Sequence, residues 1–342
     1  MRIALMPHVP FCCIYGGAER QADETMMALR RRGHEVTWLD PSDRNLAEHT
    51  DIVHFFGASY YFADWIMLLQ PIIPVALSSI FYETSYVQKS LWRVGRHVRA
   101  SKYRQVSNVL LHSDAVLPNS VAEADQLHSL FGVPTTHMHV VPNGVDLDMI
   151  GGDSERFRKS YLPDMPYDEL FVLSAHRVER RKNTHLLVEA CLRLGVPLVI
   201  AGQTNSSTQH DYVSRVMSRI NGSSGKVRYI GPLSKGSLRD AYAAAHVHAL
   251  PSTLETPGLA SLEAGLNGCN LVVGRCQPVQ EYLTGLAVLV RQDVQSIADG
   301  IALAMNSPRD MFGQASAISE RYSWDEVISS TELAYDAAIH SR

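Results

Sequence analysis

The chain has 342 residues, of which 46% are hydrophobic and 19% are charged, so it can bury one large core or two medium ones. Its formal net charge of −4 gives no global electrostatic reason to bind nucleic acid or an acidic membrane, which leaves only local basic patches for such partners. Five cysteines, an odd number without paired metal spacing, indicate reduced thiols. The first apolar run is too short for a signal peptide and no membrane-length run follows, so we expect a cytoplasmic protein.

Short apolar runs alternate with amphipathic stretches along the chain, a pattern typical of parallel strands joined by crossover helices. The first half predicts strands at 2–7, 35–40, 51–56, 74–79, 114–118 and 139–142. The second half predicts strands at 170–175, 197–202, 227–230, 247–251, 270–274 and 287–290. The sequence therefore predicts an α/β protein with two Rossmann-like domains.

A segment rich in Gly, Asp and Pro, residues 146–167, has the composition of a linker between the two halves. We predict a first domain over 1–147 and a second over 148–321. The final amphipathic stretch, 322–342, is expected to form a helix that packs back on the first domain. A cleft between two such domains is the natural place for a ligand.

The most informative stretch runs from Leu250 to Gly265, where a strand ends in a Ser/Thr/Gly/Pro loop and a helix begins near Gly258. Backbone N–H groups and the dipole at such a helix start favour a phosphate, and the carboxylate of Glu255 could accept hydrogen bonds from sugar hydroxyls. On spacing alone, a surface loop position for Glu255 and a solvated helix position for Glu263 explain the pattern equally well.

Several motifs, taken in order, resemble those of the retaining GT-B glycosyltransferases known as glycosyl transferase group 1. Glu255 and Glu263, with seven residues between them, match the family's paired glutamates. Arg177 and Lys182 match its arginine followed five residues later by a lysine. Three further matches extend the resemblance over nearly the whole chain: the glycine turn Gly16-Gly17 with the Ala-Glu-Arg that follows it, the interdomain segment 141–146, and the base-side loop 229–231.

The resemblance implies an enzyme that transfers a hexose-type sugar from a nucleotide-sugar to a hydroxyl acceptor, with retention and without metal or other cofactor. Arg177 and Lys182 would then hold the donor diphosphate and stabilise its departure, and Glu255 would contact the transferred sugar; these three are the predicted catalytic residues. The other donor-binding candidates are Gly16, Gly17, Gly231, Thr256, Pro257, Gly258, Leu259 and Glu263, with Glu263 expected at the ribose.

The sequence departs from the family pattern at two places. Many members carry a histidine just after the fourth N-terminal strand, but residues 74–83 contain none, and Ser79 and Tyr82 are the acceptor-side candidates for that place. The glycines usual beside the arginine and the lysine are replaced by His176 and Asn183. His176 either contacts the donor or packs in the core.

Asp146 and Asp148 form an Asp-x-Asp pair, which in other settings binds a metal. Because the pair lies in the interdomain motif, we expect no metal site there. The resemblance implies that the nucleotide-sugar enters as a substrate and that no cofactor is needed.

The acceptor is expected on the N-terminal domain, where a basic segment stands out. Residues 87–110 predict one helix with an apolar stripe of Val87, Leu91, Val94, Val98 and Leu110, among six Lys and Arg side chains that include the candidates Arg93 and Arg96. Three interpretations are open: a solvated face, peripheral contact with anionic lipid at the inner membrane surface, or contact with another anionic acceptor such as modified DNA. An aromatic cluster, residues 60–65, either stacks on an acceptor ring or packs in the core.

Rival functions remain at this level. A non-catalytic nucleotide-sugar-binding or nucleic-acid-binding protein is favoured by the missing histidine, and a DNA-base-modifying glycosyltransferase, a sugar phosphorylase and a nucleotide-sugar epimerase are rivals among enzymes. The paired glutamates with Arg177 and Lys182 argue against the epimerase. The acceptor hydroxyl, whether on a glycan, a lipid-linked sugar or modified DNA, is not specified by the sequence.

Overall fold

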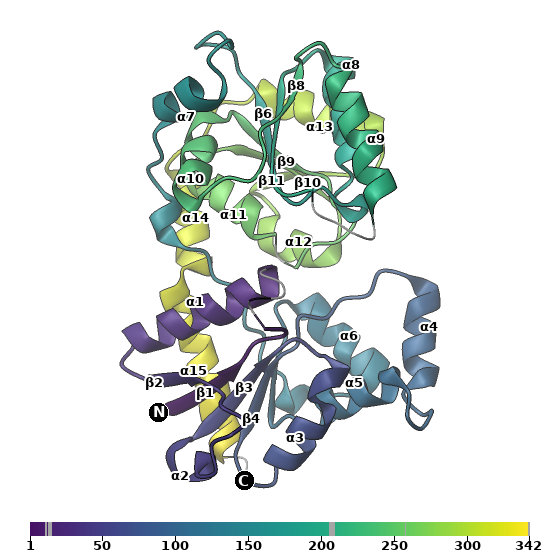
Figure 1. The fold of residues 1–342 in the computed structure, drawn as a ribbon, viewed down its shortest axis with the longest axis vertical. Coiled ribbons are helices and arrows are strands. Elements are labelled where there is room, and N and C mark those ends of the chain that lie inside the picture. Colours follow the sequence, from purple (N-terminus) through teal and green to yellow (C-terminus); the bar gives the residue numbers. More distant parts are fainter. Residues whose placement is uncertain (11, 13–15, 205–208, 257, 341–342) are drawn as a thin grey trace. The chain divides into compact units, whose positions relative to one another are not determined.

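The computed structural model describes residues 1–10, 12, 16–204, 209–256 and 258–340 of the chain. These residues form two compact α/β units, drawn as ribbons in Figure 1. The first unit contains Met1–Gly144 and Tyr322–Arg342, and the second contains Val145–Arg321. The division of the chain thus falls inside the segment 141–146.

The first unit is built on a five-stranded parallel sheet in the order β2-β1-β3-β4-β5. Its strands are β1 (Arg2–Met6), β2 (Glu35–Trp38), β3 (Ile52–Phe56), β4 (Val75–Ser78) and β5 (Ala115–Leu117). Its helices are α1 (Gly17–Arg31), α2 (Leu46–His49), α3 (Ala63–Leu69), α4 (Tyr86–Gly95), α5 (Lys102–Leu111), α6 (Val121–Phe131) and α15 (Trp324–His340), with 3-10 turns η1 (Tyr60–Phe62) and η2 (Thr135–His137).

Both faces of this sheet are covered by helices. Along β3, Ile52 and Phe56 pack in one core with α1 and α15, whereas Val53 and Phe55 pack in the other core with α3, α5 and α6. Successive side chains of a strand point to opposite faces, so a strand buried on both faces is mostly apolar. β3 is apolar at four of its five positions, and its one polar residue is the buried His54.

The C-terminal helix α15 is anchored to the first sheet by a buried histidine. The Ser78 N–H lies 3.2 Å from His54 Nε2, and His54 Nδ1 lies 2.7 Å from the hydroxyl oxygen of Tyr335 on α15. Burial lowers the pKa of His54 to about 3, so the ring is neutral and its Nδ1–H donates to Tyr335. The end of the chain is thereby bonded to a central strand of the first unit.

The second unit is built on a six-stranded parallel sheet in the order β11-β10-β9-β6-β7-β8. Its strands are β6 (Val172–Ala175), β7 (Leu198–Ala201), β8 (Val227–Tyr229), β9 (Val247–Leu250), β10 (Asn270–Gly274) and β11 (Ala287–Val290). Its helices are α7 (Ser154–Tyr161), α8 (Thr184–Leu194), α9 (His210–Asn221), α10 (Lys235–Ala244), α11 (Leu259–Leu266), α12 (Gln277–Leu283), α13 (Val294–Met305) and α14 (Gly313–Tyr322), with 3-10 turns η3 (Leu147–Met149) and η4 (Arg180–Lys182).

The strand predicted at 139–142 is not formed; just before the segment, Met138 makes an isolated bridge to Val116 of β5. The His139 N–H donates to the Val116 carbonyl and the Val141 N–H to the Pro118 carbonyl, both at 2.9 Å. A continued parallel ladder would next need an N–H from Pro118, which proline lacks. The segment is therefore extended beside β5 without becoming a sixth strand.

The single helix predicted over 87–110 is also wrong, because the segment forms two helices, α4 and α5. Ala100 adopts a left-handed backbone with φ +59°, and Ser101 starts α5 by accepting a hydrogen bond from the Arg104 N–H. The ring of Tyr103 packs on Gly95, the last residue of α4, where any side chain would collide with it. Leu110 consequently lies in the core of the unit rather than on the exposed stripe.

Among the residues that the structure describes, no helix combines the length and the apolar composition that crossing a membrane requires.

Candidate functional site

The order of the second sheet places a switch point between two strands. From β6 the chain proceeds through β7 and β8 to one side, and then returns to place β9, β10 and β11 on the other side. Ligands of such doubly wound sheets bind beyond the carboxyl ends of the strands where the order reverses. Arg177 and Lys182 follow β6, and Glu255 and Gly258 follow β9. The topology therefore brings the three predicted catalytic residues to one place.

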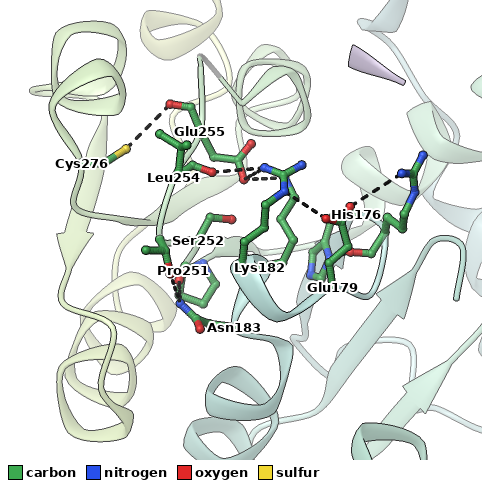
Figure 2. Close-up of polar contacts among 12 residues, drawn as sticks. His176, Glu179, Lys182, Asn183, Pro251, Ser252, Leu254, Glu255 and Cys276 are labelled. Atoms are coloured by element: carbon green, nitrogen blue, oxygen red, sulfur yellow. Dashed lines mark hydrogen bonds and ion pairs between the residues drawn. The ribbon is translucent and has the colours of Figure 1, made fainter. Parts of the chain in front are cut away.

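Lys182 and Glu255 form a direct ion pair between Nζ and Oε1, shown in Figure 2. Both side chains are nearly buried, at 10% and 11% exposure. Burial alone would raise the pKa of Glu255, but the charges of Lys182 and Arg181 outweigh it and leave that pKa below its usual value. Burial also lowers the pKa of Lys182, against the opposing effect of Glu255. Glu255 is therefore an ionised carboxylate at neutral pH.

Around this pair, charges of opposite sign alternate along the carboxyl edge. Arg177 Nη1 lies 3.9 Å from Glu179 Oε1, Glu179 Oε2 lies 3.0 Å from Arg181 Nε, and Arg181 Nη1 lies 3.8 Å from Glu255 Oε1. The five residues Arg177, Glu179, Arg181, Glu255 and Lys182 carry three positive and two negative charges. Because the two arginines are partly exposed, the excess positive charge is available to an incoming anion.

The start of α11 lies beside this charge cluster. Its cap residue, Gly258, has a left-handed backbone with φ +87°, which strongly favours glycine, and it offers no side chain to cap the first N–H groups. These groups and the helix dipole suit a phosphate or a sugar oxygen. Thr256 and Leu259 flank Gly258 and are partly buried, whereas Pro257 lies outside the described residues.

Glu263 lies on α11 with only 1% of its surface exposed. The hydroxyl of the buried Tyr242, on α10, donates to Glu263 Oε2 at 3.4 Å. The expected contact with a ribose therefore requires that an oxygen of Glu263 become accessible at the start of α11. Tyr242 was not identified from the sequence, because nothing in a helical Ala-rich stretch distinguishes it from a core residue.

Two histidines lie near the charge cluster: His248 is buried and His176 is partly buried. His176 Nδ1 lies 2.8 Å from the Arg177 carbonyl, so Nδ1 carries the proton, and the buried Nε2 has no hydrogen-bond partner among the residues that the structure describes. Burial, followed by the charge of Lys182, lowers the pKa of His176 to about 4. Within the described part of the chain, neither ring nitrogen of His248, on β9, has a hydrogen-bond partner, and burial lowers the pKa of His248 to about 3. Both rings are neutral at neutral pH.

These depressed pKa values predict that the second unit is destabilised by acid. Each histidine binds a proton near pH 6.5 when unfolded but only near pH 3–4 when folded. The free energy of unfolding therefore has its full value above pH 6.5 and decreases as the pH falls below 6.5. At pH 5 the loss is about 2 kcal/mol for His248. We expect His248→Phe to lose about 2 kcal/mol less than wild type between pH 7 and pH 5 in urea unfolding followed by circular dichroism. The exposed His210→Gln is the control, and an unchanged pH slope in His248→Phe would refute the assignment.

Gly231 follows β8 on the same edge of the second sheet. Its carbonyl accepts the Gly202 N–H at 2.9 Å, and the Tyr229 hydroxyl donates to the Gly202 carbonyl at 2.7 Å. Gly202 has no room for a side chain, because the His176 carbonyl would lie 1.9 Å from a Cβ. These contacts link the carboxyl ends of β6, β7 and β8.

In the first unit, Gly16 and Gly17 lie at the corresponding switch point, after β1, whose sheet neighbours are β2 and β3. Gly16 is the cap residue of α1, and its N–H donates to Glu19 Oε2 at 3.0 Å. None of the described residues lies within 4 Å of the position that a Cβ of Gly17 would take. Both glycines belong to the first unit, whereas the other donor-binding candidates belong to the second.

The segment after β4 is held by a buried carboxylate. Glu123 Oε1 accepts hydrogen bonds from the Ser79 hydroxyl and from the Phe81 N–H (2.8 Å), and its Oε2 accepts the Asn119 N–H at 3.0 Å. Ser79 is fully buried, and Ile80 between these bonds has a left-handed φ of +46°, which is costly for a β-branched residue. The buried Ser79 therefore helps to hold the loop after β4 in place. Tyr82 is only partly buried.

The acceptor-side candidates on α4 and the aromatic cluster differ in exposure. Arg93 is exposed, and Arg96 Nη1 donates to the Leu130 carbonyl at 3.0 Å. In the aromatic cluster, Phe62 is buried in the core, whereas Tyr60 and Tyr61 are exposed with ring centroids 4.1 Å apart. Trp65 is partly buried and packs against the core, so Tyr60 and Tyr61 are the most exposed members of the cluster.

Asp146 accepts the Asp148 N–H at 2.9 Å and forms an ion pair with Lys235 on α10. Asp146 is the cap residue of the 3-10 turn η3, and Asp148 lies within that turn.

The sequence did not identify Glu179 and Arg181 as site residues, although both lie inside the Arg177–Lys182 motif. Their alternating signs were the signal that could have revealed them.

Comparisons with known proteins bear on the family and the fold. Residues 155–319 match the family model of glycosyl transferases group 1, and residues 47–149 match the model of glycosyltransferase family 4. Both families are glycosyltransferases, and the two matches together span most of the chain.

Similar curated proteins carry the name D-inositol 3-phosphate glycosyltransferase. The one from Actinosynnema mirum is 30% identical over 247 residues, which cover 67% of this chain and 59% of that protein. The one from Mycolicibacterium paratuberculosis is 29% identical over 242 residues, which cover 68% of this chain and 54% of that protein. The chain therefore spans a little over half the length of these relatives.

Solved structures confirm the predicted fold class. Sucrose-phosphate synthase from Thermosynechococcus elongatus matches with a TM-score of 0.79 at 17% identity, with both chains covered completely. Anabaena HepE in complex with UDP matches with a TM-score of 0.76 at 17% identity over 97% of this chain and 100% of that one. At this identity the likeness establishes the fold alone, which is GT-B with two Rossmann-like domains.

Proposed function

We propose that this chain is a hexosyltransferase that transfers a sugar from a nucleotide-sugar to a hydroxyl acceptor with retention of configuration. The observation that carries the proposal is the nearly buried Lys182–Glu255 pair at the switch point of a Rossmann-type sheet, with Arg177 and Arg181 beside it. A buried ion pair is a poor device for stability, because both charges lose their hydration. Its position supports a role in binding a ligand with both anionic groups and hydroxyls.

In this proposal the two ends of the donor meet different residues. Arg177 and Lys182 bind the diphosphate and offset the negative charge that develops as it leaves, which is the work a divalent metal does in other transferases, and we therefore propose metal-independent transfer. Glu255 and the N–H groups at Gly258 orient the sugar. Glu263, which accepts a hydrogen bond from Tyr242, binds the ribose. Binding of UDP and UDP-glucose by the Anabaena relative supports a uridine nucleotide as the first donor to test.

A donor screen tests this function. Thermal unfolding is recorded with UDP-, GDP-, ADP- and dTDP-sugars, and the proposal expects one class to raise the melting temperature in proportion to its affinity. Slow hydrolysis of that donor, abolished in Glu255→Gln, would establish an enzyme rather than a binding protein. Stabilisation without any sugar release, with every acceptor class offered, would favour the non-catalytic alternative.

We further propose that α4 places the protein on an anionic lipid surface. Five apolar side chains on and just after this helix are between 43% and 81% exposed: Tyr86, Val87, Leu91, Val94 and Val98. The spacing of Val87, Leu91 and Val94 puts them on one face of the helix. From residue 84 to residue 113 the chain carries six Lys and Arg and no acidic residue. An exposed apolar face with cations beside it suits the interface of an anionic membrane.

Two other possible partners of the exposed α4 face, a second copy of the chain and a nucleic acid, explain these features less well. A second copy of the chain docked through the same face would bring two clusters of positive charge together, which is unfavourable. A nucleic acid would use the cations but would leave the apolar stripe without a partner. An anionic lipid surface can receive the exposed apolar side chains and pair with the Lys and Arg side chains beside them.

Vesicle sedimentation checks the lipid surface. We expect binding to vesicles that contain phosphatidylglycerol, weaker binding at high salt, and little binding to pure phosphatidylcholine. The double variant Val87→Gln/Val94→Gln should bind about tenfold more weakly, because two apolar side chains no longer enter the interface. Leu333→Gln, at a residue of α15 that is 68% exposed, is the matched control. Equal binding of wild type and the double variant would contradict the proposal, and salt-sensitive binding of DNA instead of vesicles would favour a nucleic-acid acceptor.

A further inference from the structure

Asn183, which directly follows Lys182, reaches across to the loop that carries Glu255. Its Nδ2 donates to the Pro251 carbonyl at 2.9 Å and to Thr253 Oγ1 at 3.2 Å, as Figure 2 shows in part. Asn183 is 7% exposed, so these bonds are shielded from water. They connect segments about 70 residues apart in the sequence.

Arg181, which directly precedes Lys182 in the sequence, also links the same two segments. The Thr253 N–H donates to the Arg181 carbonyl at 2.8 Å, and Arg181 Nη1 donates to the Leu254 carbonyl at 3.3 Å. We call the four hydrogen bonds that Asn183 and Arg181 make to residues 251–254 the brace. The brace holds the backbone of the Glu255 loop against the turn of Lys182 without using the Lys182 ammonium or the Glu255 carboxylate.

The backbone of Asn183 does not by itself require an asparagine. It is left-handed, with φ +53° and ψ +33°, a conformation that glycine adopts at least as readily. Asparagine tolerates the same conformation and adds an amide. The amide is therefore the part of Asn183 that remains to be explained, and its only described hydrogen bonds are to the Glu255 loop.

We propose that Asn183 is a positioning residue that fixes the Glu255 carboxylate relative to the Lys182 cation before the donor binds. The inference rests on the proposed function and adds to it a coupling between the two ends of the donor. With the brace intact, the diphosphate at Lys182 and the sugar at Glu255 meet a single rigid surface. Without the brace, the Glu255 loop must be ordered when the sugar binds, and that ordering costs affinity.

The inference predicts a selective loss of binding. In Asn183→Gly the left-handed backbone is retained and only the amide is removed. The dissociation constant for a nucleotide-sugar should rise about five- to tenfold more than that for the matching nucleoside diphosphate, because only the sugar depends on the Glu255 loop. Asn183→Asp should behave similarly, since a carboxylate of the same size cannot donate to the Pro251 carbonyl.

Calorimetric titration of UDP-glucose and UDP, or of GDP-mannose and GDP if the uridine pair does not bind, measures this ratio. The control is Asn270→Ala, which removes a similar amide that donates to the Ala304 and Ser307 carbonyls, both at 2.9 Å, at the opposite, amino end of the sheet. A merely structural role of Asn183 would weaken both ligands equally, as general loosening of the unit would. Equal weakening, or none, would overturn the inference.

Amide hydrogen exchange is a second measurement that needs no ligand. It tests the positioning role of Asn183 separately from the proposed function. The amide of Thr253 is held by the brace, so peptides covering 251–255 should exchange about tenfold faster in Asn183→Gly than in wild type or Asn270→Ala. If wild type binds no nucleotide but exchange accelerates as expected, the positioning role stands and the donor assignment fails. If exchange is unchanged, the positioning role is refuted whatever the protein binds.

Discussion

Replacing Lys182 with methionine is expected to destabilise the second unit by about 3 kcal/mol and to lower sugar transfer by about 10²–10³-fold. The structural cost arises because Glu255, at 11% exposure, would lose its closest cation and keep only Arg181 at 3.8 Å. The functional cost arises because the leaving diphosphate would lose a positive charge at the point where its own negative charge develops. A single substitution therefore produces both effects and cannot separate them.

A double variant separates them. In Lys182→Met/Glu255→Leu, two apolar side chains of similar size replace the buried pair, so stability should return to within about 1 kcal/mol of wild type while transfer stays undetectable. The unfolding of each unit can be followed separately, because all four tryptophans of the chain lie in the first unit. Tryptophan fluorescence should be unchanged in both variants, and circular dichroism should report the loss and its recovery. A double variant less stable than the single one would contradict this account of the pair.

Replacing Glu123 with alanine is expected to destabilise the first unit by about 3 kcal/mol or more. The substitution leaves the Ser79 hydroxyl and the backbone N–H groups of Phe81 and Asn119 without their buried acceptor. It also releases Ile80, whose left-handed backbone those bonds maintain. Tryptophan fluorescence in urea measures the effect directly.

Two companions make the Glu123 measurement specific. Glu123→Gln should cost less than the alanine variant, because its amide oxygen still accepts while its NH₂ group meets donors it cannot satisfy. Glu326→Ala, at an exposed glutamate on α15, should change stability by less than about 0.5 kcal/mol. If Glu123→Ala were as mild as Glu326→Ala, the buried carboxylate would not hold the loop after β4.

The fold class could be predicted from the sequence because a sheet covered on both faces needs mostly apolar strands. The run at 52–56 contributes to two cores at once, and this requirement leaves a clear pattern. The segment 139–142 has the same apolar character and still fails to form a strand, since the limiting group is a missing N–H on Pro118 in its neighbour. A pattern read along one segment does not include the hydrogen-bonding capacity of its partner.

The break between α4 and α5 escaped prediction for a related reason. Periodicity alone continues through Ala100, and the helix ends because Ser101 caps a new helix and Tyr103 packs on Gly95. Capping serines are visible in a sequence, but one inside an amphipathic stretch competes with propensity and periodicity for the helix. The position of the second helix depends on tertiary packing.

The site could be predicted as a set of positions but not as a set of contacts. The family resemblance predicted Arg177, Lys182 and Glu255, and the structure places them together because strand ends at a switch point converge whatever the details of the loops. Their pairing depends on how two loops about 70 residues apart meet, and that is decided by the amide of Asn183 and the backbone of Arg181. Long-range hydrogen bonds of this kind leave no periodic signal in the sequence.

Titration of nucleotide-sugars into wild type and into the folded Lys182→Met/Glu255→Leu variant tests the proposed donor site most directly. The proposal predicts that at least one nucleotide-sugar binds wild type with a stoichiometry near one, and that the double variant binds it about 100-fold more weakly. Failure of every nucleotide-sugar to bind folded wild type, or equally tight binding by the double variant, would contradict the donor site at the carboxyl edge of the second sheet.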